Sequence, residues 1–567
     1  MTPRTALLLL SLAAALSIGG IASGQAPKAL FRDIRAEAGI TYVHRSAPEK
    51  KFIHESMSGG MALFDYDNDG RVDMYFVDAL TVDTAHDPKL ARSVLYRNLG
   101  NNRFEDVTDK AGVAHPGWGQ GACTADVDGD GREDLYVTNL GPNRLYRNNG
   151  DGTFTDIAEK AGVAGGAWSM GCGFADYDRD GDLDLFVSRY VKLDLEHLPE
   201  FGKGGPGMKG TGRGADCQYR GVAVQCGPRG LPGEGDLFYR NLGDGRFEEV
   251  AAKVGVDDPH KYFGLGIAWF DADGDGWLDL FVGNDAGPNF LYMNQKDGTL
   301  KDNAFAAGVA VSEDGAEQGN MGVAVADYEN AGRFSLFSTV FAEEYNPFYR
   351  NAGSYFVDWS FRTKTAPSSL PYVGWGTGFL DYDNDGWLDI IVGNGHVYPQ
   401  LDQAKLGASA PYRQRRLLYH NRGDGTFDEV AQQYGPALNE PRVSRGLTLG
   451  DLDNDGRTDV VIADLDGHPL VLRNELPGTG NWLLVKLRGK PKNTSAVGAV
   501  VTLQAGGLTM KRLVRSGTSY ISQDDMRQHF GLGAAAAADW VEVTWSDQTK
   551  TRLENVKANQ VLEIRQE

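Results

Sequence analysis

An aspartate-rich nonapeptide returns at intervals along this 567-residue chain, and its repetition restricts the fold more than any other feature. The pattern Asp-x-Asp-x-Asp-Gly-x-x-Asp is intact in DYDNDGRVD (65–73), DVDGDGRED (126–134), DYDRDGDLD (176–184), DADGDGWLD (271–279), DYDNDGWLD (381–389) and DLDNDGRTD (451–459). A seventh copy, DYENAGRFS (327–335), has Ala331 and Ser335 where the pattern has aspartate. Such self-similarity indicates one structural unit that is copied along the chain.

Each unit carries the signals of four short strands. A glycine stands five positions before each first aspartate, at Gly60, Gly121, Gly171, Gly266, Gly322, Gly376 and Gly446. An alternating apolar stretch such as LDLFV (183–187) follows the motif, then in most units a segment like LYRN (145–148) and a turn into a segment like GDGTFTDI (150–157). Four-stranded units of about 50 residues are typical of propeller blades. The sequence predicts an all-β fold with a seven-bladed β-propeller over residues 30–475.

The two ends of the repeat region complement each other. The seventh unit reaches LVLRN (470–474) without a fourth strand, whereas an unmatched FRDI (31–34) precedes the first unit. A propeller must join its last blade to its first in order to hide its sheet edges. We therefore expect Phe31 to Ile34 to form the outer strand of the blade that contains Asp451. An open array of modules would not explain why one strand segment is extra at the start and one strand is missing from the seventh unit.

The motif has the composition of a calcium loop. Carboxylates at positions 1, 3, 5 and 9 and the backbone carbonyl at position 7 can surround one ion, and the glycine at position 6 permits the bend. Calcium is favoured over magnesium because the ligands are all oxygens on a flexible loop. We expect about six ions, with these ligands: Asp65, Asp67, Asp69, Arg71, Asp73; Asp126, Asp128, Asp130, Arg132, Asp134; Asp176, Asp178, Asp180, Asp182, Asp184; Asp271, Asp273, Asp275, Trp277, Asp279; Asp381, Asp383, Asp385, Trp387, Asp389; and Asp451, Asp453, Asp455, Arg457, Asp459.

The motif is not an EF-hand. Position 12, which requires a bidentate glutamate in an EF-hand, holds Phe76, Val137, Val187 and Val282. A strand follows where an EF-hand has a helix. The predicted site is therefore a loop between two strands.

Charge and the first residues restrict the class of protein. The formal net charge of −21 argues against nucleic acid as a partner, because that would require a large basic face. Residues 1–24 read as a signal peptide: Arg4 precedes an apolar core from Ala6 to Ile21. The alternative, an uncleaved anchor helix, would need a longer apolar run. We expect an exported protein without a membrane span in the mature chain.

Four cysteines follow the signal. Cys217 and Cys226 flank a short Gly- and Pro-rich segment, and we predict a disulfide between them. Cys123 and Cys172 fall on strands, and we interpret them as small core residues. No zinc-type spacing occurs.

The region after residue 481 predicts a small β-sandwich-like domain over residues 482–567. Its alternating segments are WLLVKLRG (482–489), AVVTLQA (499–505), WVEVTW (540–545) and VLEIR (561–565). Arg515, Ser519, Tyr520, Gln523 and His529 form a polar set that is either a binding site or a group of structural residues.

Both regions resemble known families. Segments such as FADYDRDGDLDLFV (174–187) resemble the FG-GAP/VCBS repeats of integrin α-subunit propellers, in which such aspartates bind calcium. The segments GAVVTLQAGG (498–507), RSGTSYISQ (515–523), HFGLG (529–533) and VEVTWSD (541–547) resemble the ASPIC/UnbV domain. Together they resemble the cartilage acidic protein/UnbV family of exported proteins. The resemblance implies calcium at the six intact loops and leaves out the unit with Ala331 and Ser335.

Two classes of function remain open. In the first, the protein is a calcium-stabilised extracellular scaffold for adhesion, whose insertion-bearing face or central channel meets a protein or polysaccharide. The insertions are residues 190–235 and 396–416, and the first carries Lys203, Lys209, Arg213, Arg220 and Arg229, which suit an anionic glycan or simply keep a loop soluble. In the second, the protein is a polysaccharide lyase or hydrolase that uses His54, Glu55, His396 and Tyr398. No nucleophile or zinc motif supports the second class.

Overall fold

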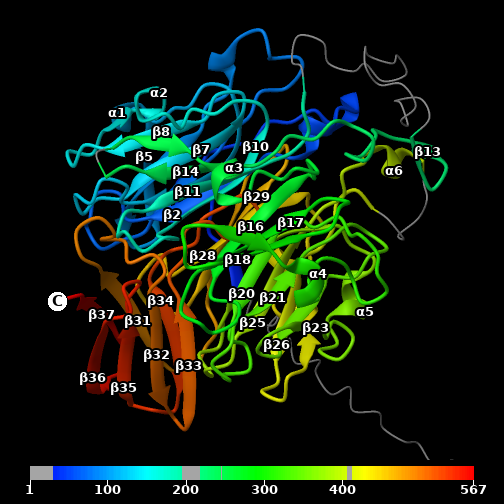
Figure 1. The fold of residues 1–567 in the computed structure, drawn as a ribbon. Coiled ribbons are helices and arrows are strands. Elements are labelled where there is room, and N and C mark those ends of the chain that lie inside the picture. Colours follow the sequence, from blue (N-terminus) through cyan, green and yellow to red (C-terminus); the bar gives the residue numbers. More distant parts are fainter. Residues whose placement is uncertain (1–29, 194–216, 244, 405–410) are drawn as a thin grey trace, which may run out of the picture.

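The computed structural model describes residues 30–193, 217–243, 245–404 and 411–567. Seven four-stranded antiparallel sheets form a ring, and a separate β domain lies below it (Figure 1). The predicted all-β, seven-bladed propeller is confirmed. The predicted signal peptide, residues 1–24, lies outside the described residues.

Each of the first six blades is a meander whose strand order follows the chain. Their strands are β2 (Met61–Phe64), β3 (Asp73–Phe76), β4 (Val94–Gly100) and β5 (Arg103–Asp106); β6 (Trp118–Ala125), β7 (Asp134–Leu140), β8 (Arg144–Asn148) and β9 (Phe154–Asp156); β10 (Ser169–Ala175), β11 (Asp184–Arg189), β14 (Leu237–Asn241) and β15 (Phe247–Glu249); β16 (Gly264–Phe270), β17 (Asp279–Asn284), β18 (Phe290–Asn294) and β19 (Leu300–Asp302); β20 (Val323–Ala326), β21 (Ser335–Ser338), β22 (Phe348–Asn351) and β23 (Phe356–Asp358); β24 (Gly374–Leu380), β25 (Asp389–Asn394), β26 (Leu417–Asn421) and β27 (Phe427–Glu429).

The seventh blade closes the ring as predicted. It contains β28 (Ser444–Gly450), β29 (Asp459–Asp464) and β30 (Leu470–Asn474), and its outer strand is β1 (Phe31–Asp33). Phe31 pairs with Asn474 and Asp33 pairs with Leu472. The innermost strands contact one another in the cyclic order β2, β6, β10, β16, β20, β24, β28 and back to β2. Strand β1 thus covers the edge of β30 that would otherwise stay open, and the last blade has its full set of four strands.

The seven glycines before the motifs lie where neighbouring inner strands approach most closely. A Cβ atom added at Gly322 would lie 2.1 Å from the carbonyl oxygen of Trp375 in the next blade, and one at Gly171 would lie 2.3 Å from that of Leu265. A Cβ at Gly446 would lie 2.4 Å from the carbonyl oxygen of Gly59, across the closure between the last and first blades. Only glycine allows this spacing, because real Cβ atoms do not approach backbone oxygens so closely.

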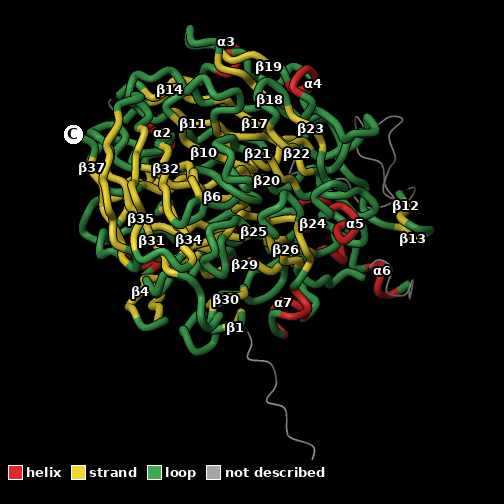
Figure 2. The backbone as a smooth tube through the Cα atoms, turned by 90° about the horizontal axis from the view of Figure 1, so that it is seen from below, coloured by secondary structure: helices red, strands yellow, loops and turns green. Residues whose placement is uncertain are grey.

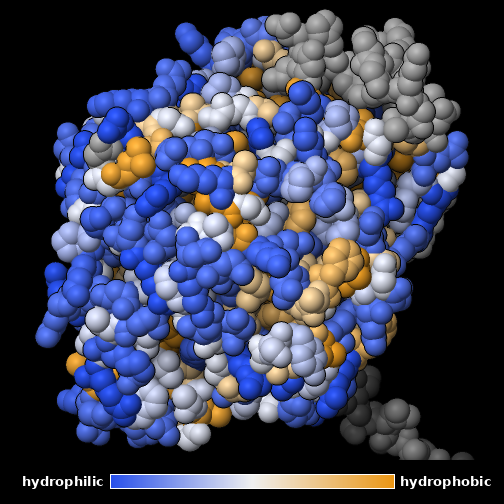
Figure 3. Space-filling model, viewed as in Figure 1, coloured by the Kyte–Doolittle hydropathy of each residue, from blue (hydrophilic) through white to orange (hydrophobic). Residues whose placement is uncertain are grey.

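The helices are single turns that connect blades or extend loops. They are α1 (Thr108–Ala111), α2 (Ala158–Ala161), α3 (Ala251–Val254), α4 (Ala304–Ala307), α5 (Ala366–Ser369), α6 (Gln400–Gln403) and α7 (Pro436–Asn439), with 3₁₀ turns at Pro48–Lys50, Ile53–Ser56, Pro88–Leu90 and Ala431–Gln433. None of the helices in the described ranges is long and apolar enough to cross a membrane. The face in Figure 3 is mostly hydrophilic, with small apolar patches between polar side chains.

The C-terminal region forms a β-sandwich, as predicted. One sheet contains β34 (Gln528–Gly533), β31 (Asn481–Arg488) and β37 (Gln560–Arg565), and the other contains β33 (Leu508–Leu513), β32 (Val500–Ala505), β35 (Ala537–Thr544) and β36 (Lys550–Lys557). Apolar side chains of both sheets, such as Val485, Leu503 and Phe530, form one core. Seen from below, strands β31 to β37 lie over one side of the ring (Figure 2).

The loop between β33 and β34 fills the central channel. Ser519 pairs with Val323 of β20, and Gln523 exchanges backbone hydrogen bonds with β2 through Met61 and Leu63. The Tyr520 hydroxyl donates to the carbonyl of Met57, and its ring packs against Trp375 with the ring centroids 4.8 Å apart. This loop and an apolar cluster that includes Tyr520 and Ile521 occupy the space in which the sequence analysis placed one of the two possible partner sites.

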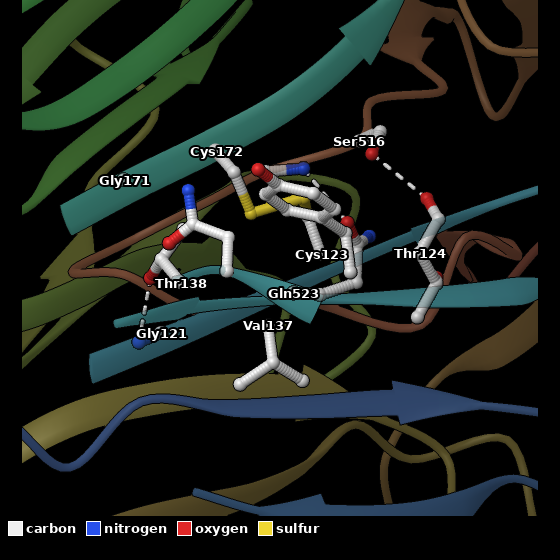
Figure 4. Close-up of a disulfide and its surroundings, with 12 residues drawn as sticks. Gly121, Cys123, Thr124, Val137, Thr138, Gly171, Cys172, Ser516 and Gln523 are labelled. Atoms are coloured by element: carbon white, nitrogen blue, oxygen red, sulfur yellow. Dashed lines mark hydrogen bonds between the residues drawn. A yellow bond between two sulfur atoms is a disulfide. The ribbon is translucent and has the colours of Figure 1, made fainter. Parts of the chain in front are cut away.

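Both cysteine pairs are disulfides, which corrects one prediction. The structure joins Cys217 to Cys226, the predicted pair. Cys123 and Cys172, interpreted above as small core residues, form a second disulfide with their Cα atoms 5.9 Å apart. They come from β6 and β10, the inner strands of neighbouring blades, so the ring brings them together (Figure 4). The same figure shows Ser516 of the channel-filling loop, which donates to the carbonyl of Thr124.

Candidate metal centres

Each aspartate loop folds around backbone N–H groups of its own, as the seventh unit shows. Asp451 accepts hydrogen bonds from Asp455 N at 3.1 Å and from Gly456 N at 2.8 Å. Asp455 in turn accepts one from Arg457 N at 3.0 Å. Gly456 has a φ of +82°, which a residue with a side chain adopts only with strain. These bonds turn the loop so that its carboxylates converge.

An asparagine at or near the end of the third strand of each blade joins neighbouring loops, a role that sequence reasoning missed. Asn474 donates its backbone N–H to Asp459 at 2.8 Å and its side-chain N–H to the carbonyl of Tyr382, in the preceding unit's loop, at 2.7 Å. Equivalent bonds recur in all units, through Asn98, Asn148, Asn241, Asn294, Asn351, Asn421 and Asn474. The recurrence of asparagine in the LYRN-like segments was the available signal.

The carboxylates of the loops form clusters that could hold metal ions. One ligand atom from each member lies within 4.8 Å of the others in the groups Asp65, Asp67, Asp73; Asp126, Asp128, Asp134; Asp176, Asp178, Asp184; Asp271, Asp273, Asp279; and Asp383, Asp389, His420. Four of these groups contain the first, third and ninth aspartates of their motifs, whereas the predicted fifth aspartates and seventh-position residues do not belong to these groups. The group with Asp383 also contains His420, which the prediction did not include and which occupies the place of arginine in the segment LYHN (418–421).

Buried oxygens without partners show that the loops fit a cation. In the third unit, Asp176 Oδ1 and Asp184 Oδ2 are buried and accept no hydrogen bond from the described residues. The same holds for one oxygen each of Asp67, Asp383 and Asp453 at the third position of their motifs. A buried carboxylate oxygen without a donor is costly, and an oxygen-seeking dication would remove that cost.

Burial and mutual repulsion raise the pKa values of the loop carboxyls. Burial raises the pKa of Asp451 and of Asp389 to about 7, with neighbouring aspartates adding to the shift. Burial likewise raises the pKa of Asp279 to about 8. Without a cation, these groups hold protons near neutral pH.

Basic side chains of the third strands partly offset the loop charges. Arg97 lies 2.6 Å from Asp67, and Arg473 lies 2.8 Å from Asp453. In the sixth unit, His420 Nδ1 lies 3.3 Å from Asp389 Oδ1, and these carboxylates raise the pKa of His420 to about 9. The loops thus retain an excess of carboxylate over basic groups.

The fifth unit keeps the loop without the charges. Asp327 accepts hydrogen bonds from Ala331 N and Gly332 N, both at 2.8 Å, as the intact first aspartates do. Ser335 accepts from Asn351 N at 3.1 Å in the place of the ninth carboxylate. Glu329 is paired with Arg350 at 2.8 Å. The loop therefore folds on hydrogen bonds and one ion pair, and its two carboxylates both have partners.

The C-terminal domain covers the loop face. Lys486 Nζ lies 3.0 Å from Asp65, Lys492 Nζ lies 2.6 Å from Asp182, and Thr494 donates to Asp126. Gly531 N donates to Asp381 at 3.1 Å, and Arg527 donates to the carbonyl of Asp451 at 2.8 Å. Loops of several blades are thus in contact with one domain, on the side of the ring opposite α6 and β13 (Figure 1).

Some residues of the predicted polar set of the C-terminal region make hydrogen bonds inside the fold, and one borders a cavity. Ser519 accepts from Thr377 N at 2.9 Å, and Gln523 accepts from Gly517 N at 2.7 Å, so these residues hold the channel-filling loop. His529 Nε2 is 3.0 Å from the carbonyl of Gly456, and burial lowers its pKa to about 4. Arg515 borders a cavity between the domain and the ring.

The acid–base groups proposed for catalysis are buried in structural roles. Burial lowers the pKa of His54 and of His396 to about 3, so both imidazoles are neutral. His396 Nδ1 accepts from Val397 N at 2.9 Å. Glu55, whose pKa burial raises to about 7, accepts hydrogen bonds from backbone N–H groups. Tyr398 is 9% exposed. This arrangement provides no accessible acid–base pair.

The insertion-bearing face carries the hairpin β12 (Gln218–Tyr219) and β13 (Val222–Ala223). Tyr219 packs against Phe341 and His396, with ring centroids 5.9 and 5.2 Å apart. Of the predicted basic patch, Arg220 pairs with Glu343 and Arg229 pairs with Glu317 at 3.1 Å, whereas Lys203, Lys209 and Arg213 lie outside the described residues. The described part of this patch is therefore largely neutralised.

Seven blades with aspartate loops and a β-sandwich on the loop face define a class of repeat propeller with an appended domain. The FG-GAP-like repeat family matches residues 65–137, 126–187, 230–282, 271–338 and 408–462, and the ASPIC and UnbV family matches residues 489–567. The chain belongs to the FG-GAP repeat family and carries a C-terminal ASPIC and UnbV domain.

Cartilage acidic protein 1 is similar to this chain. The mouse protein is 30% identical over 325 residues, which cover 56% of this chain and 47% of the mouse protein; for the human protein the coverage is 56% and 46%. The chain thus spans about half the length of the curated relatives it matches. Among solved structures, a lectin from Agrocybe aegerita that recognises terminal N-acetylglucosamine has a TM-score of 0.39 at 20% identity, over 68% of this chain and 85% of the lectin. At that score the likeness is too distant to inform function.

Proposed function

We propose that this chain is an exported, calcium-binding scaffold that presents a rigid surface to an extracellular protein or polysaccharide. The observation that carries the proposal is the set of converging loop carboxylates with buried oxygens that lack a hydrogen-bond donor. Four of the five clusters described above offer only carboxylate oxygens, the ligands that calcium prefers. Two disulfides are in keeping with an oxidising compartment, and residues 1–24 are the segment that we expect to direct export.

We expect about six calcium ions per chain, held by the thirty residues given in the sequence analysis. The residues of the loops bind and orient the ion, and each ion supplies the positive charge that the buried carboxylates otherwise obtain from protons. The stabilised loops then hold the blades in register through the asparagines that connect them.

Replacing Asp389 by Ala should remove one ion, because the ninth carboxylate belongs to the cluster with Asp383. Calorimetric titration of chelator-treated protein should give about six calcium ions for the wild type and one fewer for Asp389→Ala. Ser335→Ala, at the same motif position in the fifth unit, is the matched control and should leave the stoichiometry unchanged. A wild-type value near zero would overturn the calcium assignment.

The partner surface is expected on the insertion-bearing face, since the C-terminal domain covers the loop face and the channel is filled. Insertions on one face of a repeat protein commonly form its working surface. The full chain should bind members of a glycan and secreted-protein array in calcium buffer and lose that binding with chelator. Arg229→Glu on this face should weaken the binding, whereas Arg565→Glu on the C-terminal domain should not. New reducing ends or unsaturated products from the glycans would instead favour the enzyme hypothesis.

A further inference from the structure

A cavity of about 120 Å³ lies between the C-terminal domain and blades five to seven. Its lining includes Asp381 and Asp451 on the propeller side and Arg512, Arg515, Asp524 and Arg527 on the domain side. About 10–15 Å³ of cavity volume is enough for one water molecule. The cavity therefore has room for several waters or for one small polyatomic ion.

Two arginines of this cavity form no ion pair with a described residue, although Asp381 lies near Arg512 and Asp524 near Arg515. Arg512 is 8% exposed; its Nε bonds the carbonyl of His529 at 3.3 Å and its Nη1 bonds that of Lys511 at 3.1 Å. Its Nη2 is buried and has no hydrogen-bond partner among the described residues. The Arg515 guanidinium makes no hydrogen bond or ion pair with any described residue, and its Nη1 is buried. A buried guanidinium in this state is costly unless an anion accompanies it.

The acidic groups of the cavity are already engaged. Asp525 is paired with Arg527 at 2.7 Å. Asp524 accepts from Leu449 N at 2.9 Å. Asp381 and Asp451 accept backbone N–H groups of their own loops. The lining carries four carboxylates, Asp381, Asp451, Asp524 and Asp525, and four basic side chains, Lys511, Arg512, Arg515 and Arg527. An anion is therefore favoured by the N–H donors of Arg512 and Arg515 that have no acceptor, and not by a net positive charge.

We propose that this cavity binds a small tetrahedral oxyanion, of the size of free sulfate or phosphate, through the free N–H groups of Arg512 and Arg515. Guanidinium groups suit this ligand because their planar N–H donors match the spacing of oxyanion oxygens. The ion would join the C-terminal domain to the propeller face. The volume has room for the free ion together with some of its hydration waters.

Calcium should strengthen this site, a part of the proposal that rests on the proposed function. Asp381 and Asp451 are the first ligands of the sixth and seventh loops, and bound calcium would neutralise their charge toward the cavity. Chelation should therefore weaken sulfate binding. If the calcium stoichiometry proves near zero while sulfate still binds, the oxyanion site stands and the calcium assignment fails.

Calorimetric titration of the full chain with sodium sulfate in chloride buffer containing calcium tests the site. We expect one saturable site in the wild type and affinity at least about tenfold weaker in Arg512→Gln and in Arg515→Gln, because each loses a charged hydrogen-bond donor. Arg565→Gln, an exposed arginine of the same domain, is the matched control and should bind as the wild type does. Glucose 6-phosphate should not displace sulfate; displacement would contradict a site for the free ion.

A stability measurement keeps the test decisive if a variant folds poorly. In buffer without sulfate or phosphate, Arg515→Met should melt no lower than the wild type, since it removes an unpaired buried charge. Any one of three results would overturn the proposal. The wild type could show no saturable sulfate binding, or both glutamine variants could bind sulfate with unchanged affinity. Alternatively, Arg515→Met could melt below the wild type in this buffer and fail to bind sulfate.

Discussion

Removal of calcium should lower the melting temperature by at least about 10 °C. Each site that binds only the folded chain stabilises it by about 2.7 kcal/mol at an ion concentration of a hundred times Kd, and six such sites add. Without the ion, the carboxylates of Asp176, Asp184 and Asp453 keep buried oxygens that have no donor. Differential scanning calorimetry in calcium and in excess chelator measures the change.

The pH dependence of this effect distinguishes site-specific binding from a general salt effect. In the ion-free protein, burial raises the pKa of Asp389 and Asp451 to about 7 from an ordinary value near 3.8. The folded state then binds more protons than the unfolded state between these values, so stability falls as pH rises from about 4 through 7. Chelator should therefore lower the melting temperature more at pH 8 than at pH 6. Magnesium at equal ionic strength is the control and should not restore the melting temperature of the chelated protein. If chelator leaves the melting temperature unchanged at both pH values, the site assignment is contradicted.

The repeat architecture was predictable because each unit carries its own local signals. The motifs, the alternating strands and the surplus FRDI segment predicted the blades and the partner of β1 without reference to distant contacts. The clustering of the first, third and ninth aspartates of a motif followed from spacing alone, since all three lie within nine consecutive residues. Local sequence contains this information because each loop folds largely on its own N–H groups.

The packing between distant parts was not predictable in the same way. Cys123 lies three residues before its motif and Cys172 lies four residues before its own, so their positions in the repeat did not indicate a disulfide. The two cysteines meet because the ring places β6 beside β10. The loop that contains Tyr520 has no periodicity, and its partners, such as the Met57 carbonyl, are far away along the chain. The same loop brings Arg515 to the cavity. Such contacts depend on the assembled shape, which a single sequence does not specify locally.

The seven glycines before the motifs should be the most sensitive positions of the ring. At Gly322 the backbone itself is compatible with alanine, because its φ is not in the left-handed region. The added methyl group, however, would lie 2.1 Å from the carbonyl oxygen of Trp375 in β24. Gly322 directly precedes β20, so the two inner strands β20 and β24 cannot separate here without opening the ring. We expect Gly322→Ala to lower the free energy of unfolding by about 3 kcal/mol or more, the upper range for overpacking.

Gly166→Ala is the matched control for this substitution. No atom lies within 4 Å of the place of its Cβ, and its φ is likewise outside the left-handed region. Because alanine reduces the freedom of the unfolded chain, this change should be neutral or stabilise by up to about 1 kcal/mol. Urea unfolding of both variants in calcium buffer, followed by tryptophan fluorescence, measures the difference. Equal midpoints would show that neighbouring inner strands are farther apart than the structure places them, and the explanation of the seven glycines by close approach would then be wrong.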